Sequence, residues 1–131
     1  VGTRVQVTDW EMPQTGILHI KTQALERFVI RTTESDAQGL LRGKVDDIGA
    51  ESRIAVPNDL RMAVDILRHI MEQVGADAFP EPLQFDNAVW VGYRLSEVLT
   101  LKLSVKQSLL EMNDSITRLR ILNEFLKRQI S

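Results

Sequence analysis

The chain has 131 residues, 44% of them hydrophobic and 26% charged, and its sixteen basic and eighteen acidic side chains give a net charge of −2. This size and composition are typical of one globular domain, with or without an extension. The near-neutral charge removes the electrostatic driving force for strong non-specific nucleic-acid binding, and no apolar run approaches the roughly 20 residues that cross a bilayer. The lack of cysteine excludes disulfides, thiolate zinc sites and iron–sulfur clusters. It also fits a reducing compartment, so a cytoplasmic location is expected.

From Val1 to Ile48 the apolar residues alternate with polar ones, as in β-strands with one buried face. Val5 and Val7 are predicted to lie on one face of their strand, and Leu18 and Ile20 are predicted to point inward. Short turns between the segments predict an antiparallel meander. Four strands are expected, over residues 3–8, 17–22, 27–33 and 40–46.

After Pro57 the apolar spacing changes to steps of three and four residues, which is typical of amphipathic helices. Helices are predicted from about residue 60 to 74, where Gly75 ends the pattern, and from 87 to 98. A third is predicted to begin with a capping box formed by Ser104 and Gln107, and a fourth to be capped by Asp114 or Ser115. We therefore expect a β-rich part over residues 1–57 and a helical part over residues 58–131.

The segment 106–122 (KQSLLEMNDSITRLRIL) joins the last two predicted helices. Leu109, Leu119 and Leu122 are expected to pack inside the helical part. A solvated or inter-helix set of charges, each contributing little to stability, is expected at Glu111, Arg118 and Arg120.

No group of residues in the sequence predicts a catalytic centre, a cofactor site or a metal site. Residues 39–45 (GLLRGKV) are one residue short of a phosphate-binding loop, and Val45 occupies the position of the metal-binding hydroxyl. His19 and His69 lack ligand spacing. A Ser–Lys pair at Ser104 is conceivable, but helix capping explains that serine better.

Four residues are candidates for contacting a bound peptide: Phe28, Trp90, Tyr93 and Leu95. Trp90 and Tyr93 lie three positions apart on a predicted helix, so both could meet one groove. Core packing is the default interpretation of such a pair, and an exposed anchor is the alternative.

Short motifs follow one another along nearly the whole chain. They are residues 2–7 (GTRVQV), 16–20 (GILHI), 24–30 (ALERFVI), 93–103 (YRLSEVLTLKL), 106–111 (KQSLLE), and Asp114 followed by Arg118-Leu119. In this order they resemble the amino-terminal, substrate-binding domain of Lon proteases, a module also found as stand-alone bacterial proteins. Ala24 stands where that family usually has glycine. The family's opening strand and helix have no counterpart, so we expect residues before Val1, or another chain, to complete the strand edge.

The resemblance implies an α+β fold, with an antiparallel PUA-like β pseudo-barrel, here incomplete, followed by a C-terminal helical lobe. It implies a non-catalytic protein- or peptide-binding module, because neither the ATPase loop nor the Ser–Lys centre of the protease has a match in these residues. The expected partner is unfolded or extended polypeptide, and a protease or a second copy at the unpaired strand edge is a further expected partner. No cofactor and no membrane partner is expected.

Two other functions stay open at this point. PUA-like barrels also bind RNA, and Arg27, Arg31, Arg42 and Lys44 could form a basic strip on the strands, although acidic residues offset it. A small-molecule enzyme is the other alternative, but no residue pattern names a reaction.

Overall fold

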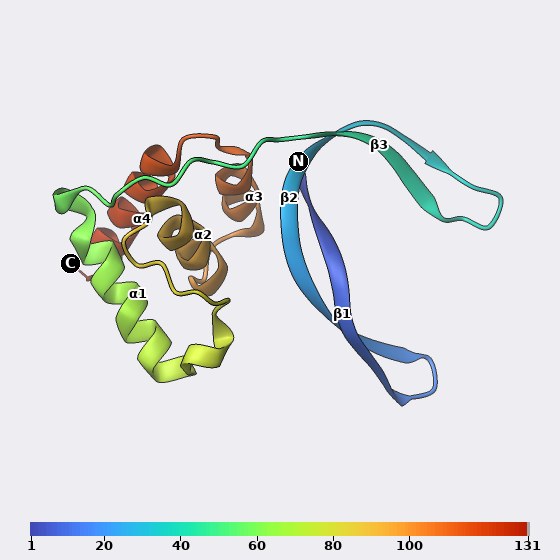
Figure 1. Cartoon of the computed structure of the whole chain (residues 1–131), viewed down its shortest axis with the longest axis horizontal. Helices are drawn as coiled ribbons and strands as arrows, with labels where there is room; N and C mark the ends of the chain where they lie inside the picture. Colours follow the sequence, from blue (N-terminus) through green and yellow to red (C-terminus); the bar gives the residue numbers. More distant parts are fainter. Residues whose placement is uncertain (131) are drawn as a thin grey trace. The chain divides into compact units, whose positions relative to one another are not determined.

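The computed structural model describes residues 1–130, and the chain divides after Ala50 into two compact units. We call them the sheet unit (Val1–Ala50) and the helical unit (from Glu51 onward), and Figure 1 shows the strands of the first and the helices of the second. The sequence pattern placed this boundary after Pro57. Residues 51–57 join the helices instead, because Val56 is buried in their core and the Ile54 carbonyl accepts a 2.8 Å hydrogen bond from the Ala88 amide.

The sheet unit is a three-stranded antiparallel meander in the order β1-β2-β3, with β1 Gly2–Gln14, β2 Ile17–Ser35 and β3 Leu41–Asp47. Gly16 sits in the turn between β1 and β2 with φ of 86°, a backbone conformation that glycine adopts without strain. The predicted antiparallel meander and the α+β class are confirmed. Among the described residues the sheet is open.

The prediction of four strands is wrong in one place, because the second and third expected strands form the single strand β2. Residues 23–26 contain neither glycine nor proline, and Gln23 and Ala24 pair with Gln6 and Val5 of β1. Where a turn was expected, β2 continues, and its pairing with β1 only shifts register between Thr3 and Val5.

The helical unit contains α1 Arg61–Val74, α2 Ala88–Val98, α3 Leu103–Glu111 and α4 Ser115–Ile130, with short 3-10 turns at Asn58–Leu60 and Ala76–Ala78. Gly75 ends α1 with φ of 95° and donates its amide to the Met71 carbonyl. No helix within residues 1–130 is both long and apolar enough to cross a membrane.

Two helices are capped at their start by a side chain. The Asn87 side chain accepts a hydrogen bond from the Val89 amide at α2, and Asp114 Oδ1 accepts from the Ile116 and Thr117 amides at α4. The capping box at Ser104 is wrong, because α3 begins two residues earlier than that cap predicts and Lys102 occupies the N-cap. The Ser104 carbonyl instead accepts a hydrogen bond from the Ser108 hydroxyl within the helix.

The buried apolar core described here lies entirely in the helical unit. Its centre is made by α1, α2 and α4, whose stripes of leucine, valine and alanine interlock. Phe79 and Phe85 approach the Trp90 ring edge-on, with centroids 6.1 and 5.2 Å away. Leu109, Leu119 and Leu122 are buried as expected. The helices are thus a self-contained domain core, whereas the strands expose their apolar side chains.

Candidate functional site

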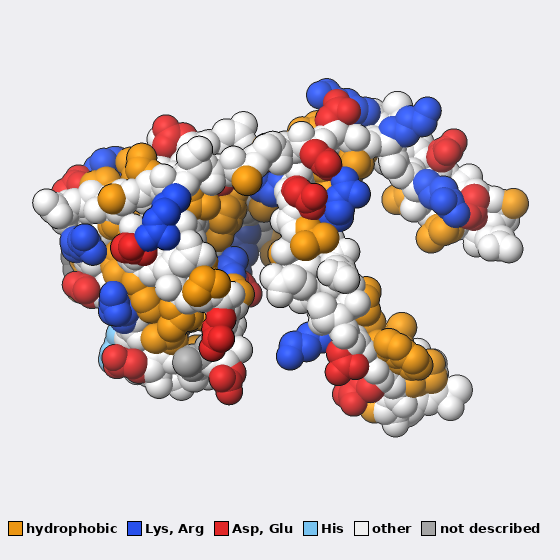
Figure 2. Space-filling view, viewed as in Figure 1, with side chains coloured by type: hydrophobic (Ala, Val, Ile, Leu, Met, Phe, Trp, Pro, Cys, Tyr) orange, Lys and Arg blue, Asp and Glu red, His pale blue; other side chains and the backbone are white. Residues whose placement is uncertain are grey.

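The apolar side chains of β1 and β2 gather on one face of the hairpin that these strands form. We call this the apolar hairpin face, and it is made by Val5, Val7, Trp10, Met12, Leu18 and Ile20. Figure 2 shows the hydrophobic side chains along one side of this hairpin and charged ones on the other. The face therefore has the one-sided pattern of a sheet built to cover an apolar partner.

A β-bulge brings Trp10 onto this face. Val7 pairs with Thr22 and Asp9 pairs with Lys21, so β1 carries one extra residue between these pairs. Without that residue, Trp10 would lie on the opposite side from Val7, because they are three positions apart. With it, Trp10 pairs with Ile20 and joins the apolar side chains.

The opposite face of the same hairpin is polar. Its cross-strand pairs are Gln6 with Gln23, Asp9 with Lys21, and Glu11 with His19. His19 Nδ1 lies 3.5 Å from a Glu11 carboxylate oxygen. Water solvates this face well, so the two sides of the hairpin differ sharply in their affinity for an apolar partner.

The apolar hairpin face is open to solvent among the described residues. Val7 is 53% exposed and Trp10 is 64% exposed, and their neighbours on the face are exposed to a similar degree. Single exposed apolar residues are normal on proteins, but a contiguous patch of this kind marks a contact surface. Val5 and Val7 share a face as predicted, and the structure places Leu18 and Ile20 on the same face, where no described residue buries them.

The β2–β3 hairpin carries charges that are largely paired with one another. Arg31 Nε lies 2.5 Å from Asp46, and Arg42 Nε lies 3.7 Å from Asp36. Arg4 of β1 donates to Asp47 at 2.6 Å, which raises the pKa of its guanidinium. These carboxylates offset the basic strip that the sequence suggested, so the strands do not present a row of cations for phosphates.

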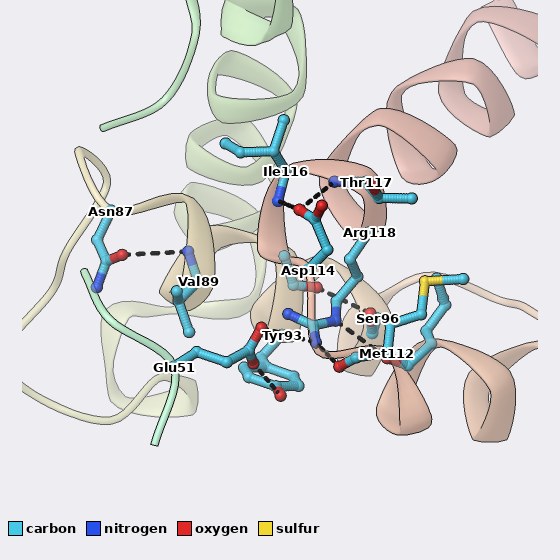
Figure 3. A network of polar contacts seen from close by, with 12 residues as sticks. Glu51, Asn87, Val89, Tyr93, Ser96, Met112, Asp114, Ile116, Thr117 and Arg118 are labelled. Atoms are coloured by element: carbon cyan, nitrogen blue, oxygen red, sulfur yellow. Dashed lines mark hydrogen bonds and ion pairs between the residues drawn. The ribbon is translucent and has the colours of Figure 1, made fainter. Parts of the chain in front are cut away.

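In the helical unit, Glu51 and Arg118 form a buried ion pair at 3.1 Å (Figure 3). The Arg118 side chain has no exposed surface and that of Glu51 is 8% exposed. Tyr93 donates its hydroxyl proton to Glu51 at 2.5 Å, and its ring lies 4.2 Å below the guanidinium carbon of Arg118. Arg118 also donates to the Leu109 and Met112 carbonyls at the end of α3.

Of the two alternatives expected for Arg118, this network shows the inter-helix charge and not the solvated one. It joins α2, α3 and α4 to the segment before α1, and it satisfies carbonyls that the end of α3 leaves without helical partners. We call it the Glu51–Arg118 network. Its groups already bond to one another, so its role is to hold the helices together.

The four residues predicted to contact peptide belong to both units, three to α2 of the helical unit and Phe28 to β2 of the sheet unit. Leu95 has no exposed surface and Trp90 is 8% exposed, and both belong to the core of the helical unit. Tyr93 is half-buried and bonded to Glu51. Phe28 lies in the sheet unit on β2, opposite Gly2 of β1. The candidates on α2 therefore have the packing role that was the default interpretation.

Two shallow depressions occur on the described surface. One of about 350 Å³ is lined by Thr32–Glu34 and Arg42–Lys44, and one of about 360 Å³ is lined by residues 51–54 and 113–116. In the second, Glu51 is held by the buried network, and Asp114 caps α4. Within residues 1–130 no three acidic or histidine side chains cluster as metal ligands would.

Comparisons with known proteins agree on one family. The family model described as "ATP-dependent protease La (LON) substrate-binding domain" matches residues 1–128. A crystal structure of a Lon N-terminal domain protein from Xanthomonas campestris is similar, with a TM-score of 0.75 and 25% sequence identity. The match covers 92% of this chain and 64% of the Xanthomonas chain, so this chain spans less than two thirds of the length of that protein. No curated protein matches.

Proposed function

Because this chain belongs to the Lon substrate-binding domain family, we propose that it is a binding module for polypeptide substrates. The observation that carries this proposal is the family match over residues 1–128, which includes both the sheet unit and the helical unit. The substrates of a protease are polypeptides, and a polypeptide that has lost its fold exposes apolar segments. An open apolar sheet face suits such a partner.

The proposed module binds without carrying out chemistry itself. The carboxylates nearest the depression at residues 51–54 and 113–116 have structural roles, in the buried network and in the α4 cap. These 131 residues contain no motif that matches a protease centre. In this proposal, a separate protease centre cleaves the bound polypeptide. We place this activity in the cytoplasm.

A binding titration tests the proposal directly. Ribonuclease A that is reduced and carboxymethylated stays unfolded, and native ribonuclease A is the matched folded control. Fluorescence anisotropy of each labelled form is followed as the chain is added. We expect saturable binding of the unfolded form and none of the native form. Equal binding of both, or no binding at high micromolar concentrations, would contradict the proposal.

RNA binding is the competing function that the same assay can detect. Contacts to phosphates release counterions, so RNA affinity should fall steeply as salt is raised. Polypeptide binding through apolar side chains should change little, or strengthen slightly, over the same range. A labelled single-stranded RNA that binds more tightly than the unfolded protein, with a steep salt dependence, would replace the polypeptide proposal.

A further inference from the structure

We draw no further inference here: the strongest candidate, the apolar hairpin face around Val7, Trp10 and Ile20, is left open by the residues that the structure describes, and nothing in the structure shows what covers it.

Discussion

Removal of Glu51 should destabilise the helical unit far more than removal of a surface carboxylate. In the Glu51→Ala variant, Arg118 stays buried and keeps its bonds to the Leu109 and Met112 carbonyls, but its charge loses the only carboxylate partner shown within residues 1–130. Breaking a buried pair by removing one partner costs about 3–5 kcal/mol. The two remaining carbonyl bonds place the expected loss near the lower end, at about 3 kcal/mol.

The same helix offers a matched control. Arg120 of α4 binds Asp59 at 2.7 Å, and these side chains are 51% and 64% exposed. Asp59→Ala therefore removes the carboxylate of an Arg–Asp pair that water screens, and the loss should be about 0–1 kcal/mol. Both variants remove a carboxylate that pairs with an arginine of α4, so the difference between them reports the burial of the Glu51 pair together with its hydrogen bond from Tyr93.

Urea unfolding followed by far-ultraviolet circular dichroism measures both losses, since helices dominate that signal. Tyr93→Phe adds a finer step, because it removes the hydrogen bond to the Glu51 carboxylate and should cost about 1.5–3 kcal/mol. In the double variant Glu51→Ala/Tyr93→Phe the losses should fall short of additivity, because both changes act on one network. Equal and small losses for Glu51→Ala and Asp59→Ala would refute the buried network.

Three further changes test the helical unit. Leu119→Ala should cost about 2–5 kcal/mol in the same urea experiment, because its side chain is fully buried; a loss as small as that of a surface variant would contradict this. Hydrogen bonds to Asp114 from Thr117 lower its pKa, so the α4 cap contributes stability above about pH 4 that is lost as the pH falls through the lowered folded pKa. Asp114→Asn should remove this part of the acid sensitivity, and an unchanged pH profile of unfolding would count against it. Gly75→Ala should cost about 1–3 kcal/mol because of its φ of 95°, while Gly49→Ala, without such a φ, should cost much less in the same melts.

Elements with a strong local pattern could be predicted from the sequence. The apolar steps of α1, together with Gly75 after its last residue, reproduce that helix to within one residue. Asp114 caps α4 because a carboxylate at that position reaches the free amides of the first turn. Ser104 failed as a cap because α3 already begins at Leu103. Serine also occurs inside helices, where its hydroxyl can donate to a carbonyl one turn away, as that of Ser108 does to the Ser104 carbonyl.

The candidate site was harder to predict, because local pattern says which residues are apolar and not what covers them. The motif at Trp90, Tyr93 and Leu95 is consistent with a core helix, the default interpretation, and with a binding groove, and the structure places Trp90 and Leu95 in a core. Leu18 and Ile20 of the apolar hairpin face were predicted to point inward. The alternation of Val5 and Val7 indicated that the strand has an apolar face. Whether that face is exposed depends on the folded chain and not on the local pattern.

The sequence by itself determined that strands precede helices, the family and the near-neutral charge, because periodicity, motifs and composition are local properties. Tertiary structure alone decided the state of Arg118, since its carboxylate partner lies 67 residues earlier in the chain. It also decided the side of the hairpin on which Trp10 lies, because one extra residue in β1 changes the register against β2. Burial and register depend on which distant segments meet, and a local pattern of residues does not contain that information.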